Sequence, residues 1–352
     1  MSFSIFEHKD IFELESKQSL PQLHLAYHHF GKLNASGTNV VWVFHALTAN
    51  SDPTEWWSGV VGDGCFINPT DYFIICVNIP GSCYGSISPS DINPLTDKPY
   101  LINFPLFTIR DIIQAFKLLK NHLCIHSIKI GIGGSMGGQQ LLEWAVEEPN
   151  LFENIIPIAT NAKHSQWGIA FNESQRWAIE QDPSWNVGNI NDGESGMKIA
   201  RSIALLSYRN YSMYKNTDQL ENKNAITYQR YQGEKLANRF NAYSYWFLSK
   251  SMDLHDLSRK NKSITISLSA IKANCLVISI ISDLLFPVEE QLFLAENIPN
   301  AKYFSITSKY GHDGFLIESS TINEIIQSFV NTSFIIDKHL INHRAMKHIP
   351  FF

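Results

Sequence analysis

One short segment constrains the fold more than any other. Residues 131–138 read GIGGSMGG and stand between an apolar run and a helical pattern, so that G-G-S-M-G at 133–137 fits G-x-S-x-G. Small residues two positions before and after Ser135 let the backbone turn sharply from a strand into a helix. Such a turn exposes the serine hydroxyl at a helix N-terminus, where developing negative charge is favoured. Ser135 is therefore the candidate nucleophile.

Two other interpretations fit a glycine-rich segment of this kind. A glycine-rich turn without chemistry also matches a bare G-x-S-x-G, although the strand before it and the helix after it argue against that. A dinucleotide-binding G-x-G-x-x-G starting at Gly131 fails because Met136 stands where the last glycine is required.

Strands and helices alternate on both sides of the segment. Apolar runs predict strands, and amphipathic spacing predicts helices. The predicted strands are 40–44, 72–78, 127–132, 154–159, 275–281 and 303–306. The predicted helices are 109–123 with Thr108 as its N-cap, 137–148, 289–297 and 322–330. This alternation indicates a mostly parallel central sheet flanked by helices on both faces.

A long stretch interrupts the alternation. From His164 to Leu257 the chain is rich in aromatic and polar residues at helical spacing and has no strand pattern. We expect residues 164–257 to form an inserted helical cap. Residues 1–163 and 258–335 then make up the core domain, and residues 336–352 a C-terminal tail to which the sequence assigns no role.

A serine needs a base and an acid to become nucleophilic. Asp283 follows the predicted strand 275–281, and His312 lies in YGHDG after the strand 303–306. The carboxyl ends of parallel strands share one edge of a sheet, and the order Ser, Asp, His is that of the α/β-hydrolase fold. We therefore predict this fold, with a triad of Ser135, Asp283 and His312. The plainer alternatives are a helix cap for Asp283 and a surface loop for His312.

The same fold predicts where the oxyanion would bind. One donor is the backbone N–H of Met136, directly after the nucleophile, and the other comes from the loop His45–Thr48 after the first strand. We assign the second donor to Leu47. Because both donors are backbone groups, side-chain identity tests this assignment weakly.

Composition excludes several other classes of protein. The net charge is −5 without long single-sign blocks, which argues against nucleic-acid binding. The five cysteines include no C-x-x-C pair, so we expect no metal site. No signal peptide or membrane-spanning run is seen, and a reducing cytoplasm is the expected location.

Several segments, in order over residues 40 to 318, resemble the homoserine O-acetyltransferase family. They are HALT at 45–48, Trp56-Trp57, GSCYGS at 81–86, GGSMGG at 133–138, LEWA at 142–145, HSQWGIAFNE at 164–173, YQG at 231–233, SDLLFP at 282–287 and GHDGFL at 311–316. The family is cytoplasmic and usually dimeric, and it makes an activated homoserine ester for methionine synthesis. The resemblance therefore implies an enzyme and a homodimer.

The resemblance also implies a reaction. Ser135 would take the acyl group from acetyl-CoA, a co-substrate, and pass it to the hydroxyl of L-homoserine with His312 as base throughout; no tightly bound cofactor is implied. The family's arginine in the cap and its aspartate after the catalytic histidine touch the amino acid. The matching positions are Arg201 and Asp313, which would pair with the carboxylate and the ammonium. Arg209 is a rival for Arg201, and a solvated helix charge is the plainer interpretation.

The sequence leaves the substrates open and departs from the family in three places. Ser86-Ile87-Ser88-Pro89 replaces S-T-G-P, Ala49 replaces a glycine, and Arg239-Phe240-Asn241-Ala242 replaces R-F-D-A. Succinyl-CoA as donor or serine as acceptor would suit the same triad. So would water, which makes the protein an esterase, and an inactive family member could serve as a binding protein.

Overall fold

The computed structural model describes residues 3–215 and 224–331, and the expected tail at 336–352 lies outside them. In the described part, a sheet of eight strands runs in the order β1-β4-β6-β5-β9-β10-β11-β12. These strands are β1 (Ser4–His8), β4 (Leu23–Phe30), β5 (Val40–Phe44), β6 (Phe73–Val77), β9 (Ile128–Gly134), β10 (Phe152–Ile158), β11 (Asn274–Ile280) and β12 (Ala301–Ile306). From β6 to β12 every pair is parallel. The predicted mostly parallel sheet is confirmed.

Helices lie on both faces of the sheet, and β5 shows why. Val40, Trp42 and Phe44 belong to one buried cluster, whereas Val41 and Val43 belong to the other. Alternate side chains of a strand point to opposite faces, so a strand that is apolar throughout must be covered twice. The first cluster includes residues of α2 (Ile109–His122), α3 (Met136–Glu147) and α11 (Val288–Asn297), and the second includes residues of α13 (Ser319–Asn331).

The predicted elements agree with the structure to within a few residues at each end. Thr108 caps α2 as expected, and its side chain and that of Asp111 form a reciprocal capping box. The described chain also contains shorter elements that sequence patterns did not indicate. They are α1 (Pro53–Trp56), α9 (Ser258–Asn261), α10 (Ile264–Ser269), α12 (Gly314–Ile317) and the ladders β2 (Phe12–Glu13) with β3 (Ser19–Leu20) and β7 (Ile92–Asn93) with β8 (Lys98–Pro99).

The two strands at the N-terminal edge were also not predicted. β1 pairs antiparallel with β4, and β4 pairs antiparallel with β6. β4 reads LHLAYHHF, in which histidines share the strand with apolar residues, so no continuous apolar run marks it. The alternation of its first residues is the signal that could have found it.

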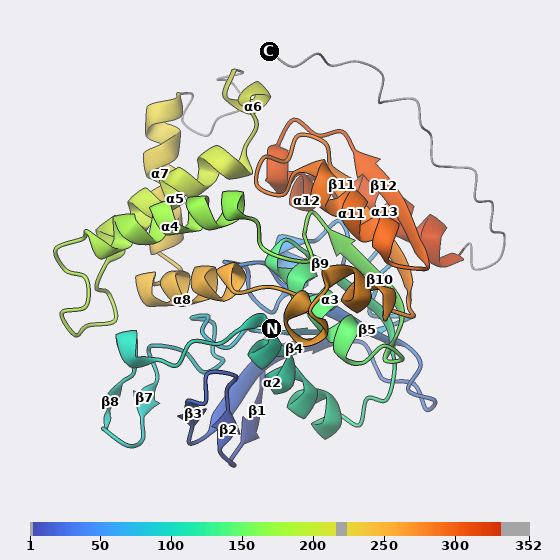
Figure 1. The fold of residues 1–352 in the computed structure, drawn as a ribbon, viewed down its shortest axis with the longest axis horizontal. Coiled ribbons are helices and arrows are strands. Elements are labelled where there is room, and N and C mark those ends of the chain that lie inside the picture. Colours follow the sequence, from blue (N-terminus) through green and yellow to red (C-terminus); the bar gives the residue numbers. More distant parts are fainter. Residues whose placement is uncertain (1–2, 216–223, 332–352) are drawn as a thin grey trace.

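Between β10 and β11 the described chain is helical, as expected, and we call the helices α4 to α8 the cap. They are α4 (Gln166–Glu180), α5 (Glu194–Tyr208), α6 (Tyr211–Lys215), α7 (Ala225–Ala237) and α8 (Ala242–Asp253). Figure 1 shows them gathered to one side of the sheet, with α4 and α5 side by side. The end of α5 contacts the short 3-10 turn Gly311–Asp313, so the cap reaches the loop that carries His312.

Candidate active site

Ser135 stands on a strained turn between β9 and α3. Its backbone angles are φ 57° and ψ −127°, which a residue with a side chain rarely adopts. A Cβ on Gly137 would lie 2.1 Å from the carbonyl oxygen of Phe44, and one on Gly133 would lie 2.6 Å from Gly137. Both positions therefore require glycine, and the G-x-S-x-G pattern follows from the close packing of the turn against β5.

The turn is fixed from the neighbouring strand. The N–H of Ser135 donates to the carbonyl of Ile158 at 3.0 Å, and the hydroxyl of Thr160 donates to the carbonyl of Ser135 at 2.8 Å. These bonds leave the side chain of Ser135, which is 5% exposed, as the part of the residue that is free to react.

Asp283 and His312 meet although they are carried by different loops. Nδ1 of His312 lies 2.6 Å from Oδ2 of Asp283. The other carboxylate oxygen accepts the N–H groups of Leu285 and Phe286 at 2.8 and 2.9 Å, so the carboxylate is held in one orientation. An acceptor at Nδ1 favours the tautomer with the proton on Nδ1, which leaves Nε2 as the basic nitrogen.

The ring of His312 is buried among aromatic side chains beside the turn. Its centroid lies 5.1 Å from that of Phe286, 5.3 Å from Phe315 and 5.6 Å from Tyr208. Phe315 packs against Gly134, the residue before Ser135, where an added Cβ would lie 2.5 Å from the ring. Within the described residues no hydrogen bond joins Ser135 to His312. Such bonds are often long in an enzyme without substrate and tighten when it binds.

Hydrogen bonds tie the loops of Asp283 and His312 together. Ser282 donates its hydroxyl to the carbonyl of Ser308 at 2.5 Å and accepts the N–H of Gly311 at 3.2 Å. Gly311 has φ 62°, and a Cβ there would lie 2.8 Å from the carbonyl of Tyr208 in the cap. On the other side of His312 in the sequence, the indole N–H of Trp57 donates to the carbonyl of Phe315 at 2.9 Å. The histidine loop is thus fixed from three sides.

The two backbone groups expected to bind an oxyanion are free to do so. Met136 is the first residue of α3, where an N–H has no partner inside the helix. Leu47 lies in the loop after β5. In the described part of the chain neither N–H donates a hydrogen bond.

Two arginines of the cap lie near the loop of His312, Arg209 against Asp313 and Arg201 against Tyr208. Arg209 forms an ion pair with Asp313 and donates to the hydroxyl of Tyr228 at 3.2 Å. The guanidinium of Arg201 lies 5.5 Å from the centre of the Tyr208 ring, and its buried Nε has no hydrogen-bond partner in the described residues. Each arginine thus keeps one buried nitrogen without a hydrogen-bond partner among the described residues, Nε of Arg201 and Nη1 of Arg209. They differ in that Arg209 already has a carboxylate partner in Asp313, whereas Arg201 has none there.

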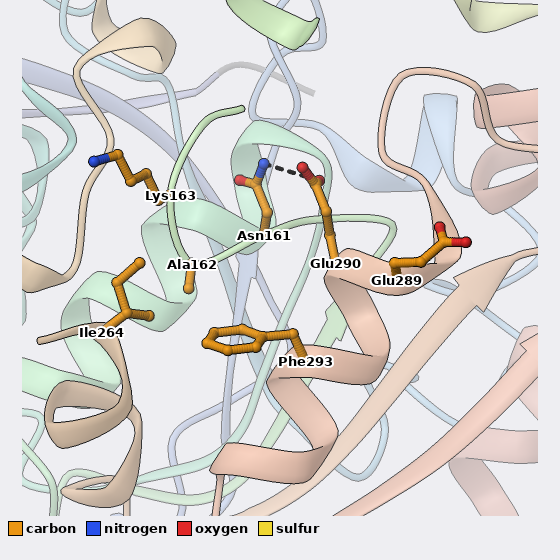
Figure 2. A pocket seen from close by; sticks show the side chains of 7 residues that line it. All are labelled: Asn161, Ala162, Lys163, Ile264, Glu289, Glu290 and Phe293. Carbon is orange, nitrogen blue, oxygen red and sulfur yellow. Dashed lines mark hydrogen bonds between the residues drawn. The ribbon is translucent and has the colours of Figure 1, made fainter. Parts of the chain in front are cut away.

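A separate hollow of about 240 Å³ lies between residues 161–163, α10 and α11 (Figure 2). Asn161, Glu290, Phe293 and Ile264 are among the residues that line it, and Asn161 donates to the carboxylate of Glu290 at 3.0 Å. Burial raises the pKa of Glu290 to about 7, and the bond from Asn161 opposes this rise. None of the three triad residues lines the hollow, so we do not assign it to catalysis.

The described residues, 3–215 and 224–331, offer no obvious metal site. There, no three His, Cys, Asp or Glu side chains are grouped so that they could hold a metal ion.

No described helix is both long and apolar enough to cross a membrane.

Comparison with known proteins identifies the family. The profile of the alpha/beta hydrolase fold matches residues 39–319. A homoserine O-acetyltransferase from Cyclobacterium marinum is 46% identical over 334 residues, which cover 94% of this chain and 95% of that protein. The chain belongs to the homoserine O-acetyltransferase family. A second member, from Nostoc punctiforme, is 41% identical over 90% of this chain and 92% of its own length.

Solved structures place the homoserine O-acetyltransferase family among proteins of the same fold. The homoserine O-acetyltransferase from Staphylococcus aureus is 28% identical, with a TM-score of 0.81 over 96% of this chain and 98% of its own. Esterase E22 has a TM-score of 0.84 at 21% identity, over 94% of this chain and 99% of its own. Family members and esterases thus share one architecture, and the fold alone does not select the acyl acceptor.

Sequence motifs mark Ser135, Asp283 and His312, but they do not mark contacts between segments far apart in the chain. The ring of Tyr208 against His312 and the ion pair of Arg209 with Asp313 were not foreseen. The sequence signal for these two contacts is limited to the position of Tyr208 and Arg209 at the end of a helical pattern.

Proposed function

We propose that the protein transfers an acetyl group from acetyl-CoA to the hydroxyl of L-homoserine through an acyl-Ser135 intermediate. The observation that carries the proposal is the 2.6 Å bond between His312 and Asp283, in a chain 46% identical to a homoserine O-acetyltransferase over 94% of its length. Ser135, on the strained turn beside Phe315, is the nucleophile of this triad.

Acylation comes first. Oγ of Ser135 attacks the thioester carbonyl carbon while Nε2 of His312 takes the hydroxyl proton. The oxyanion is bound by the N–H groups of Leu47 and Met136, each worth about 3 kcal/mol of transition-state stabilisation. The C–S bond breaks, and His312 returns the proton to the leaving thiolate. Asp283 stabilises the charged imidazole between these steps.

Transfer repeats the same steps with an alcohol. The homoserine hydroxyl attacks the acyl-serine carbonyl, and His312 takes the proton of that hydroxyl. The second oxyanion uses the same two N–H groups. Its collapse breaks the bond to Oγ of Ser135, His312 protonates that oxygen, and the acyl ester of homoserine leaves.

We assign recognition of the acceptor to Arg201 and Asp313. Arg201 has an unpaired Nε and stands over Tyr208, which touches His312, so a carboxylate bound there would lie near the base. Asp313 would accept the ammonium while it shares its charge with Arg209. Under the proposed division into a core, residues 1–163 and 258–335, and a cap, residues 164–257, the amino acid binds between the two.

We also propose that the protein is a homodimer that associates through the cap. Large apolar side chains are exposed on its helices, including Trp177 on α4, Leu206 on α5 and Ile226 on α7, at 64%, 57% and 73%. Exposed apolar residues gathered on one region mark interaction surfaces. Sedimentation that gives a monomer at micromolar concentration would contradict this.

A cytoplasmic location and the absence of a tightly bound cofactor complete the proposal. All five cysteines are free thiols, as in a reducing compartment. The only small molecules that the reaction needs are the acyl thioester and the amino acid. No nucleic acid or membrane takes part.

A substrate panel tests the proposal. Acetyl-CoA and succinyl-CoA are each mixed with homoserine, serine or no acceptor, and thiol release is followed. We expect turnover with acetyl-CoA that depends on homoserine. Thiol release that ignores the acceptor would identify an esterase, and preference for succinyl-CoA or serine would change the substrate but keep the triad.

A further inference from the structure

Arg239 joins the cap to the loop that carries Leu47. It lies between α7 and α8, and its Nη1 donates to the carbonyl of Thr48 and to the hydroxyl of Tyr84, both at 2.5 Å. The thiol of Cys83 also donates to the carbonyl of Arg239 at 3.6 Å. Arg239 is exposed, and in the described chain its guanidinium has no carboxylate partner. A cation is therefore placed on one backbone carbonyl next to the oxyanion site.

The carbonyl of Thr48 is one end of a chain of two peptide groups. Its peptide partner, the N–H of Ala49, donates to the carbonyl of Ala46 at 3.1 Å. That carbonyl in turn belongs to the peptide whose N–H is that of Leu47. Since a trans peptide places C=O and N–H on opposite sides, fixing the carbonyl of Ala46 aims the N–H of Leu47 the other way.

The remaining contacts hold the same loop from the core. The imidazole of His45 is fully buried. Its Nδ1 lies 2.9 Å from the carbonyl oxygen of Ala46, and its Nε2 accepts the N–H of Ile79 at 3.0 Å. Gln140 of α3 donates to the carbonyl of His45 at 3.2 Å. Core contacts therefore fix the start of the loop, and Arg239 is the cap residue that fixes its end.

We propose that Arg239 is a positioning residue for the oxyanion hole, acting through the peptide groups Thr48–Ala49 and Ala46–Leu47. The chain runs from the guanidinium to the Thr48 carbonyl, from the Ala49 N–H to the Ala46 carbonyl, and from the Leu47 N–H to the oxyanion. A positive charge at its carbonyl end polarises each bond in the same sense and makes the last N–H a stronger donor. The contact between the cap and the core at Arg239 thereby determines how strongly the N–H of Leu47 binds the oxyanion.

The inference rests on the proposed use of Leu47, and it differs from the simplest alternative, that Arg239 binds an anionic part of acetyl-CoA. A positioning role affects both chemical steps, because both oxyanions use the same hole. An anion-binding role affects only the thioester that carries phosphates. A donor without phosphates, p-nitrophenyl acetate, separates the two.

The experiment compares wild type with Arg239→Ala and Arg239→Lys, and uses Arg230→Ala as the control. Arg230 is an exposed arginine on α7, so its removal changes the net charge equally. Stopped-flow release of p-nitrophenolate gives the acylation rate of Ser135. Decay of the acyl-enzyme with homoserine, or with water if homoserine is no acceptor, gives the second rate. Acylation by this ester can be followed even if the proposed substrates are wrong.

We expect Arg239→Ala to slow both steps by a similar factor of about three to thirty, less than the loss of a whole oxyanion donor. The KM for acetyl-CoA and the melting temperature should stay close to wild type, and Arg239→Lys should recover part of the rate through its charge. The control should keep wild-type rates. A raised KM for acetyl-CoA with normal p-nitrophenyl acetate kinetics would overturn the proposal, as would unchanged rates in both steps.

Discussion

Replacing Asp283 with asparagine should remove the basic nitrogen of His312 without disturbing the fold. The carboxylate oxygen Oδ1 accepts two backbone N–H groups, from Leu285 and Phe286, at 2.8 and 2.9 Å. An asparagine must place its carbonyl oxygen there, because its NH2 group cannot accept these bonds. Its NH2 then faces Nδ1 of His312, which becomes an acceptor and moves the ring proton to Nε2. In that tautomer the ring cannot take the proton of Ser135.

The size of the effect follows from this reversal. Every hydrogen bond around residue 283 can still form, so the melting temperature should change little. The imidazolium, by contrast, loses both its orientation and its counter-charge, and such a change lowers kcat by about 10⁴-fold. This corresponds to about 5 kcal/mol of activation free energy.

The assay is the rate of Ser135 acylation by p-nitrophenyl acetate, read beside a thermal melt. Glu290→Gln is the matched control, because Glu290 is a second partly buried carboxyl whose charge acts on Asp283 but which bonds Asn161 instead. The control should stay within about threefold of wild type, because a pKa of about 7 already leaves Glu290 largely neutral near neutral pH and glutamine keeps an oxygen that accepts the bond from Asn161. Retention of more than a tenth of the rate in a folded Asp283→Asn protein would refute the tautomer argument.

Three further predictions follow from the same structure. Asp313→Asn should raise the KM for homoserine and leave acylation by acetyl-CoA near wild type; equal loss in both would remove its binding role. Gly137→Ala, whose Cβ would lie 2.1 Å from the Phe44 carbonyl oxygen, should cost about 2 to 3 kcal/mol and lower the melting temperature; a normal melt would contradict the packing. Burial lowers the pKa of His45 and His164 to about 4 and of His255 to about 3, so the unfolded state binds more protons as pH falls below 6.5. Between pH 4.5 and 7 the raised pKa of Glu290 has the opposite effect, because the folded state then binds the extra proton and gains stability as pH falls. The loss of stability from the three histidines is larger than this gain. Urea unfolding should show roughly 3 kcal/mol less stability at pH 5 than at pH 7.5, and equal stabilities would refute this.

The sequence predicted the part of the fold in which one local rule dominates. Strands such as Val40–Phe44 are apolar throughout because both faces are covered, and the glycines around Ser135 record a turn that no other residue fits. The β4 strand was missed because its histidines broke the apolar pattern. The cap was predicted as helical, but its contacts were not, since pairs such as Arg209 with Asp313 join segments far apart in the chain.

The three departures from the family pattern show the same limit. Asn241 caps α8 by accepting the N–H of Ser244 at 2.8 Å, which aspartate would also do. Ala49 does not have a positive φ, so no glycine is required there. Ile87 is buried, and its backbone bonds His24 and Gly81. These substitutions are compatible with the fold. This compatibility follows from backbone angles and hydrogen bonds, which sequence patterns do not specify.

The central claim is that Ser135 carries the acyl group between donor and acceptor. The most direct measurement is the intact mass of the protein after mixing with acetyl-CoA, followed by peptide mapping, with Ser135→Ala as the control. We predict one acetyl group on Ser135, its loss on addition of homoserine with formation of the acetyl ester, and no acetylation of the folded variant. An unmodified Ser135 under turnover, or full acyl transfer by the alanine variant, would contradict the account.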